Sequence, residues 1–396
     1  MKLSNRITGM QESPVRKLVP IATRIKKEGK KVYHLNIGQP DIETPKVFMD
    51  AIHNMDTKVI AYSFSQGEPS LLNAISNYYK RSDINIEPSD VLITNGGSEA
   101  LINTCIAICD EGDDVLVPEP FYTNYNGFTK GVNVNVVPIT TRAEDGFHLP
   151  SKEEIVKAIT PKTKAILFSN PGNPTGCIYR KDELEMLAEI AKEHDLWIVS
   201  DEVYRGFAYD GLEAISFGNI EGVEDRVILV DSVSKRYSAC GARIGCVASK
   251  NKDFIAQYVK LCQSRLCVPT LEQIGAAALY ELPDSYVEEM RQVYENRRDI
   301  VFNTLSNMEG VVCKKPTGAF YVIAKLPVEN AEDFVIWMLE EFDVDGETAM
   351  LAPAEGFYAT DGLGKDEVRI AYILNETDLA KAMNILDLGL KAYKNR

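Results

Sequence analysis

Short apolar runs alternate with amphipathic segments from about residue 88 onward. Runs of three or four apolar residues predict strands at 91–94, 115–117, 134–137, 165–168, 196–199 and 227–230. Runs without polar alternation are typical of a parallel sheet covered on both faces. The segment 182–194 has apolar residues at the i, i+3, i+4, i+7 spacing of an amphipathic helix. This regular alternation of strands and helices predicts βαβ units and an α/β fold.

The pattern changes toward the C-terminus. Long charged helical segments and apolar strand runs are mixed there, at 284–308, 331–342, 319–323 and 367–372. Pro269 and the turn at 281–284 interrupt the pattern just before this region. We therefore predict a second, smaller α+β domain, joined to the first near residue 285.

The 396 residues include 58 Asp and Glu against 43 Lys and Arg, a net charge of −15 at pH 7. Because a protein that binds the nucleic-acid backbone needs a basic face, this balance argues against nucleic acid. No apolar stretch approaches the roughly 18 residues of a spanning helix, so we expect no membrane segment. The eight cysteines form no CxxC pair, and the N-terminus lacks the apolar core of a signal peptide, which favours a cytoplasmic protein. The four histidines form no metal-binding motif, so we expect no metal site.

Polar motifs follow several of the predicted strands. Ligands of open α/β sheets bind at the carboxyl ends of the strands, so these motifs mark the place where we expect chemistry. The motifs are Gly96-Gly97-Ser98, the Ser-Asn-Pro-Gly-Asn-Pro-Thr-Gly turn at 169–176, Ser-Asp-Glu-Val-Tyr at 200–204 and Asp-Ser-Val-Ser-Lys at 231–235, followed by Arg243.

With these motifs in this order, the chain resembles the pyridoxal-phosphate-dependent aminotransferases of fold type I over about residues 33–372. The resemblance implies a large domain with a mostly parallel seven-stranded sheet between helices, plus a smaller α+β domain. It implies an N-terminal arm at 1–45 that packs with the small domain, a large cofactor-binding domain at 46–285 and a small domain at 286–396. It also implies a homodimer with shared active sites.

Lys235 resembles the lysine with which this family forms a Schiff base to the cofactor aldehyde. A primary amine must be partly neutral for that reaction, so its pKa must lie below the ordinary value of roughly 10.4. Asp201 resembles the carboxylate that keeps the pyridine nitrogen protonated. Tyr204 and Asn173 resemble the residues that hydrogen-bond the 3-oxygen of the ring. An ordinary turn residue is the competing interpretation of Asn173.

The cofactor phosphate requires an anion-binding site. Gly97 and Ser98 lie where a helix is predicted to begin near Ser98, and its N-terminus offers free N–H groups and a positive dipole. By resemblance, Ser232 and Ser234 add hydroxyl groups and Arg243 adds a bidentate cation. A surface ion pair is the competing interpretation of Arg243.

Two tyrosines resemble further cofactor contacts. Tyr122 occupies the position of an aromatic residue that stacks on the cofactor ring, and a core aromatic is the competing interpretation. Tyr62 resembles the tyrosine that reaches across the dimer interface to the neighbouring phosphate. The sequence departs from many relatives at Ala242, where they have Trp.

The substrate residues come from other parts of the chain. Arg369 resembles the arginine whose planar fork binds the substrate α-carboxylate, and Gly38 and Asn173 are expected to contribute to the same site. Against the net charge of −15, we expect Arg369 and Arg243 to be buried cations. Some aspartate-specific relatives carry a Lys where this chain has Ser98, so aspartate is only the default substrate.

These residues predict an enzyme that moves an amino group between an L-amino acid and a 2-oxo acid by a ping-pong Schiff-base mechanism. The closest alternative is a β-lyase that eliminates cysteine conjugates with the same fold and cofactor. A ligand-sensing module on this fold is a third interpretation, which the presence of Lys235, Asp201 and Arg369 disfavours.

Overall fold

A seven-stranded sheet forms the centre of the larger part of the computed structural model, which describes residues 1–396. Its strand order is β2-β8-β7-β6-β5-β3-β4, and only β8 runs antiparallel to its neighbours. The strands are β2 (Val91–Thr94), β3 (Asp114–Glu119), β4 (Asn135–Thr140), β5 (Thr163–Ser169), β6 (Trp197–Asp201), β7 (Val227–Ser232) and β8 (Gly245–Ala248). The predicted α/β class with a mostly parallel sheet is therefore confirmed.

Successive residues of each strand point to opposite sides of this sheet, so both faces carry apolar side chains. Helices cover both faces. Val115 and Val117 face one core, whereas Leu116 between them faces the other. The first face carries α5 (Gly96–Ile108), α6 (Asn124–Gly131) and α10 (Lys252–Arg265). The second carries α4 (Pro69–Lys80), α7 (Lys152–Lys157), α8 (Lys181–Glu193) and α11 (Thr270–Tyr280). The outlying α3 (Val47–His53) packs on α11.

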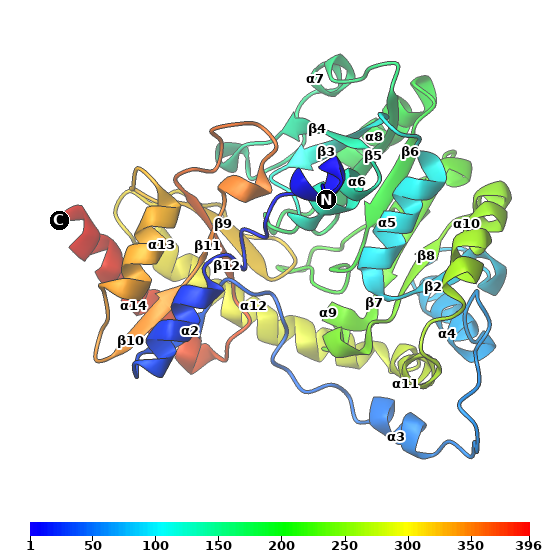
Figure 1. The fold of residues 1–396 in the computed structure, drawn as a ribbon, viewed down its shortest axis with the longest axis horizontal. Coiled ribbons are helices and arrows are strands. Elements are labelled where there is room, and N and C mark those ends of the chain that lie inside the picture. The colour runs from blue at the N-terminus through cyan, green and yellow to red at the C-terminus, as the bar shows by residue number, and fades with distance from the viewer.

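A second core surrounds two small sheets (Figure 1). One has the order β11-β12-β9 and the other pairs β1 with β10 in parallel. The strands are β1 (Lys31–His34), β9 (Tyr321–Lys325), β10 (Glu347–Met350), β11 (Ala352–Pro353) and β12 (Glu367–Ala371). The helices around them are α2 (Val19–Lys27), α12 (Asp284–Ser306), α13 (Ala331–Glu340) and α14 (Glu376–Lys394). The short α1 (Asn5–Thr8) lies beside α6 instead.

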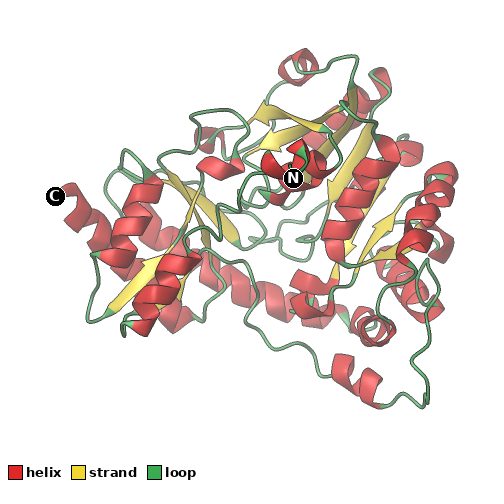
Figure 2. Cartoon of the chain, viewed as in Figure 1, coloured by secondary structure: helices red, strands yellow, loops and turns green.

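Figure 2 shows how strands and helices alternate in the larger part and how one long helix, α12, leads into the smaller one. Tyr286, near its start, packs against the core of the large sheet, and Tyr294 belongs to the second core. The domain limits at 45 and 285 remain a prediction. No helix is both long and apolar enough to cross a membrane.

The sequence pattern placed six strands of the large sheet correctly and missed β8. Strand β8 has only four residues and begins with Gly245, and glycine weakens the hydrophobic pattern by which a strand is predicted. Helix α5 begins at Gly96 rather than near Ser98, and Gly96 has a φ of 77°. Residues before β8 cross closely over this helix start, so the missed strand lies directly beside the predicted phosphate site.

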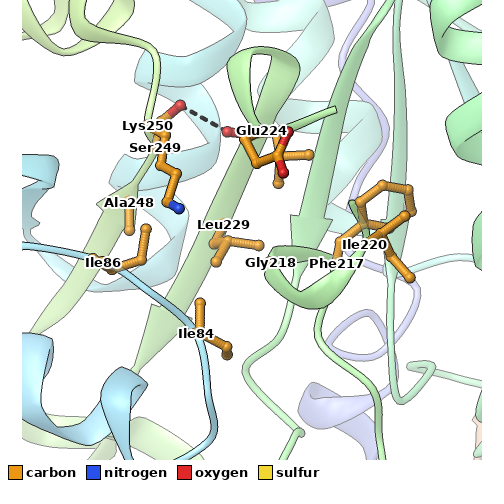
Figure 3. Close-up of a pocket in the computed structure, with 11 residues that line it drawn as sticks. Ile84, Ile86, Phe217, Gly218, Ile220, Glu224, Leu229, Ala248, Ser249 and Lys250 are labelled. Atoms are coloured by element: carbon orange, nitrogen blue, oxygen red, sulfur yellow. Dashed lines mark hydrogen bonds between the residues drawn. The ribbon is translucent and has the colours of Figure 1, made fainter. Parts of the chain in front are cut away.

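A small apolar cavity of about 20 Å³ lies near the amino-terminal end of β7, at the opposite end of the strands from the motifs (Figure 3). Leu229, near the start of β7, and Ala248, at the end of the antiparallel β8, line it together with Ile84 and Phe217. That volume holds about one water molecule. The cavity is thus a packing defect remote from the carboxyl ends of the strands.

The close approach of β8 to α5 predicts an effect of substitution at Gly245. A Cβ there would lie 2.6 Å from the carbonyl carbon of Gly96 and 2.7 Å from the nitrogen of Gly97. Because both neighbours are backbone atoms, we expect Gly245→Ala to lower the free energy of unfolding by about 1–3 kcal/mol. Gly241→Ala is the matched control, since nothing lies within 4 Å of its Cβ. Chemical denaturation of both variants checks this, and equal stabilities would contradict the close contact.

Candidate active site

Asp201 ends β6 and is buried beside the ends of β5 and β7. The hydroxyl of Tyr125 donates a hydrogen bond to its Oδ2 at 2.8 Å, and the backbone N–H of Val203 lies 3.4 Å from Oδ1. Burial raises the pKa of Asp201 to about 6, although these two hydrogen bonds oppose the rise. No Lys or Arg forms an ion pair with this carboxylate. Asp201 is therefore a buried acid without a cationic partner.

Lys235 lies on α9 (Val233–Arg236), the single helical turn that follows β7. Its Nζ donates to the carbonyl oxygen of Gly38 at 2.7 Å and lies 3.9 Å from Sγ of Cys240. The ring of Phe320 is 5.9 Å from the same nitrogen. Lys235 forms no ion pair, so its amine is held by neutral groups. It points toward the segment that contains Gly38.

The turn that carries Lys235 is fixed from both sides. Ser232 caps α9, because its Oγ accepts the N–H of Ser234 at 3.1 Å, and the two hydroxyl oxygens are 2.7 Å apart. Arg236 donates to both carboxylate oxygens of Asp231, at 3.1 and 2.9 Å, and both residues are fully buried. This buried ion pair, which the sequence did not reveal, anchors the backbone on either side of the lysine.

Tyr204 and Tyr321 meet hydroxyl to hydroxyl at 2.9 Å. Tyr321 begins β9, and its hydroxyl occupies the space beside Gly38, where a Cβ would lie 1.7 Å from the oxygen. Gly38 is therefore required for this close approach. Tyr321 was not predicted, since it stands in an apolar strand run and its polar tip was the only available signal.

Arg369, on β12, is 3% exposed, so its predicted burial is confirmed. Nη1 donates to Oδ1 of Asn173 at 3.2 Å, Nη2 donates to the carbonyl of Asn36 at 2.5 Å, and Nε has no partner. The guanidinium lies 4.5 Å from the ring centre of Tyr321 and 5.0 Å from that of Phe357. Burial lowers the pKa of Arg369. No carboxylate of the chain neutralises this buried cation.

Arg243 differs from the expectation, because its side chain is exposed rather than buried. Arg243 itself has a left-handed backbone conformation, with φ 54°, directly after the turn 240–242. This conformation directs its side chain outward over the start of α5. Nη1 donates to the carbonyl of Cys240 at 3.0 Å, and a Cβ on Gly96 would lie 2.5 Å from Nη2. Arg243 forms no ion pair, so the competing interpretation as a surface ion pair is wrong.

Gly97 and Ser98 lie half-buried in the first turn of α5. The side chain of the N-cap residue Asn95 accepts none of the first N–H groups of this helix, and Glu99 accepts only the N–H of Asn95 itself, so the N–H groups of the first turn remain available to an anion. Arg243 extends over the same turn, which places a cation beside these donors. The structure thus brings together the predicted phosphate residues of α5 and the loop before β8.

Tyr122 is half-buried just after β3. Its ring lies edge-on to Tyr125 with centres 5.6 Å apart, and its hydroxyl accepts the amide of Asn124 at 2.8 Å. Burial raises the pKa of Tyr122 to about 12. Tyr62 is different, because it is 81% exposed on a loop and makes none of the hydrogen bonds that join the other site residues.

The remaining contacts were not predicted from the sequence. Tyr125 follows Tyr122 by three residues, a helical spacing that could have suggested a shared face. Asn36 and Phe357 gave no signal, because each acts through the fold: one by its backbone carbonyl and one by its ring face. No group of three His, Cys, Asp or Glu side chains is arranged to hold a metal ion.

Comparison with known proteins agrees with this geometry. The family model described as aminotransferase class I and II matches residues 30–385. An aspartate aminotransferase of Bacillus subtilis is 33% identical, covering 100% of this chain and 98% of its own length. An aromatic-amino-acid aminotransferase of Thermococcus litoralis is 32% identical over the full length of both chains.

A solved structure shows the same architecture. The alanine aminotransferase of Pyrococcus furiosus superposes with a TM-score of 0.90 at 32% identity, covering 99% of this chain and 100% of its own. Sequence and fold therefore agree over the whole length of the chain. The chain belongs to the class I and II aminotransferases.

Proposed function

We propose that this aminotransferase uses pyridoxal 5'-phosphate, bound through Lys235, to move an amino group between an L-amino acid and a 2-oxo acid. The observation that carries the proposal is Arg369, a buried cation that no carboxylate of the chain neutralises. A buried charge of this kind requires an anionic partner, and an amino acid supplies one. Because Arg369 packs on Tyr321, which in turn touches Gly38, its substrate would lie beside the amine of Lys235.

The residues present fit the cofactor. The uncapped start of α5, the hydroxyls of Ser232 and Ser234, and Arg243 form an anion site suited to its phosphate. Asp201, buried without a cation, suits the protonated ring nitrogen, which would restore its ordinary pKa.

Three further side chains suit the ring itself. Tyr122 offers a half-buried ring face, and Tyr204 and Asn173 offer polar groups for the ring oxygen. Asn173 also reaches Arg369, so it links the cofactor site with the substrate site.

When bound, pyridoxal phosphate supplies an aldehyde that takes up the amino group and a ring that withdraws electrons from the substrate Cα. Arg369 holds the substrate α-carboxylate with its planar fork, and Asn173 orients that fork. The neutral Nζ of Lys235 would take the proton from the substrate Cα and hold it as an ammonium group, acting as the general base. The carbonyl of Gly38, 2.7 Å from Nζ, keeps the free amine at the reacting end of the site.

Aspartate-type specificity is the default for the substrate. The relatives are named as aminotransferases of aspartate, of aromatic amino acids and of alanine. Their names therefore agree on the reaction and differ in the amino acid. We place the enzyme in the cytoplasm, because all eight cysteines are unpaired.

We also propose a homodimer with shared active sites. Val59, Ile60, Tyr62 and Phe64 form an exposed apolar run, each between 63% and 81% exposed. Such a run on a single chain marks a surface that another protein covers. A second copy would bring Tyr62 to the phosphate site of its neighbour.

The unpaired carboxylate of Asp201 predicts a pH-dependent gain in stability for Asp201→Asn. Between about pH 4 and pH 6 the folded chain keeps this proton and the unfolded chain does not, so ionisation lowers the stability of the cofactor-free protein as pH rises. The rise from 3.8 to about 6 corresponds to roughly 3 kcal/mol at most. We expect Asp201→Asn to melt higher than the wild type at pH 8 and alike at pH 4.

The control is Asp231→Asn, which removes the partner of a buried arginine. It should destabilise the protein at both pH values, by about 3–5 kcal/mol. Thermal unfolding of the three cofactor-free proteins makes the comparison. A lower melting temperature for Asp201→Asn at pH 8 would show that its carboxylate stabilises the fold.

The proposed reaction predicts two half-reactions that can be seen separately. Purified protein loaded with pyridoxal phosphate should absorb visible light, lose that band with an L-amino acid alone, and regain it with 2-oxoglutarate. Lys235→Ala should bind the cofactor without the wild-type band and lose at least about 10³-fold in rate. Release of pyruvate from a cysteine conjugate, with no return of the band on adding an oxo acid, would indicate a β-lyase instead.

The proposed dimer predicts a solution mass of twice 44.1 kDa by light scattering. Ile60→Glu should give monomers and weaken cofactor binding, because a charge would be buried at the interface. Leu212→Glu is the matched control. Leu212 is an exposed apolar residue like Ile60 but lies outside the apolar run, so this change should leave the dimer intact. A monomeric wild type with normal cofactor affinity would disprove the shared site.

A further inference from the structure

Glu119, the last residue of β3, is a fully buried acid that the proposed reaction does not use. Four neutral groups donate hydrogen bonds to its carboxylate. Oε2 accepts the N–H groups of Ala359 at 2.8 Å and Thr360 at 3.0 Å. Oε1 accepts the hydroxyl groups of Thr360 at 2.6 Å and Thr140 at 2.9 Å. Because a buried carboxylate is stable only when its oxygens are hydrogen-bonded, Glu119 holds these donors firmly in place.

Three of these four donors lie on the connection between β11 and β12, which we call the docking segment for residues 354–360. Strands β11 and β12 belong to a small sheet, whereas Ala354 and Phe357 pack in a core of the large sheet. The N–H of Phe121 also donates to the carbonyl of Phe357 at 2.9 Å. Glu119 and Phe121 therefore attach a segment of the small domain to the end of β3.

The docking segment carries one of the two rings that lie against the guanidinium of Arg369. The ring centre of the fully buried Phe357 is 5.0 Å from that guanidinium. Phe357 is fixed by the bond from Phe121 to its own carbonyl and by the bond from Ala359, two residues later, to Glu119. Arg369 has only two hydrogen-bond partners and no carboxylate, so the ring faces contribute strongly to its orientation.

We propose that Glu119 is a positioning residue for substrate binding, which fixes Phe357 and thereby the plane of the Arg369 guanidinium. This rests on the proposed function, because it assumes that Arg369 binds the substrate α-carboxylate. A planar guanidinium binds a carboxylate through two parallel hydrogen bonds only when its plane is held. Every L-amino acid carries an α-carboxylate, so loosening the docking segment weakens the binding of all donors alike.

Hydrogen exchange of the cofactor-loaded protein tests whether Glu119 fixes the docking segment. Glu119→Ala removes the acceptor of three hydrogen bonds from this segment, so the amides of Ala359 and Thr360 should exchange about 10- to 100-fold faster. Glu119→Gln keeps one oxygen for the two N–H groups, and its amide can donate to the two threonine hydroxyls. Its exchange should stay within about 3-fold of the wild type.

Kinetics test whether the docking segment acts on the substrate through Arg369. Glu119→Ala should raise the KM of L-aspartate and of L-alanine by the same factor, about 10- to 100-fold, and change kcat less than about 3-fold. Glu119→Gln should return both KM values to within about 3-fold of the wild type. In an Arg369→Gln background, Glu119→Ala should raise KM by less than about 3-fold, because the guanidinium that it positions is gone.

Two threonines provide a matched pair of milder variants, since their hydroxyls donate to the same oxygen of Glu119 from opposite sides. Thr360→Val removes a bond from the docking segment and should raise KM about 3- to 10-fold. Thr140→Val removes a bond from β4 and should change KM less than about 2-fold. This pair decides the question if Glu119→Ala does not fold.

The outcomes separate the two proposals. Wild-type KM values in both Glu119→Ala and Thr360→Val, equal KM values in the two threonine variants, or an undiminished effect in the Arg369→Gln background would overturn the role of Glu119. A Glu119→Gln variant as weak as Glu119→Ala would overturn it too, because the amide preserves the hydrogen bonds. A wild type that transaminates no donor would instead overturn the proposed function, while hydrogen exchange would still decide whether Glu119 fixes the docking segment.

Discussion

The buried guanidinium of Arg369 is the constraint around which the site is built. The interior offers it only dipoles and ring faces: an amide oxygen from Asn173, a carbonyl from Asn36, and the rings of Tyr321 and Phe357. These partners come from four segments that are distant in sequence, and each contact is directional. The geometry that keeps one uncompensated charge inside the protein also brings the two cores together at the place where the substrate would bind.

Asp201 presents the same situation with the opposite sign. Several other buried charges are neutralised internally, as Arg236 is by Asp231 and Arg298 by Asp210, whereas the buried carboxylate of Glu119 is satisfied by hydrogen bonds alone. Arg369 and Asp201 have no such internal partner, and a lone buried charge lowers stability until a ligand supplies one. Binding free energy from cofactor and substrate would therefore also appear as folding stability.

Much of the fold was readable from local pattern, and the site only from motifs. Apolar runs located six strands of the large sheet, because five of them are buried along most of their length and only the edge strand β4 is half-exposed. Strand β8 escaped because four residues beginning with glycine carry little pattern. Arg243 was expected inside, yet a left-handed turn directs it outward, and backbone conformation of that kind is not written in residue type. Tyr321 reaches the site by tertiary packing alone, so no spacing rule could have assigned it.

The pairing of β1 with β10 has a consequence for how the enzyme is made. Lys31 lies opposite Glu347, and Leu35 exchanges backbone hydrogen bonds with Met350 and Ala371. These contacts join residues that are more than 300 positions apart. Because closing so long a loop costs conformational entropy, we expect these contacts to form late in folding. During synthesis, the N-terminal residues emerge first and must wait for nearly the last strand before they can dock. Asn36 and Gly38 take their places with that docking, so a nascent or truncated chain would lack their contacts with Arg369 and Lys235.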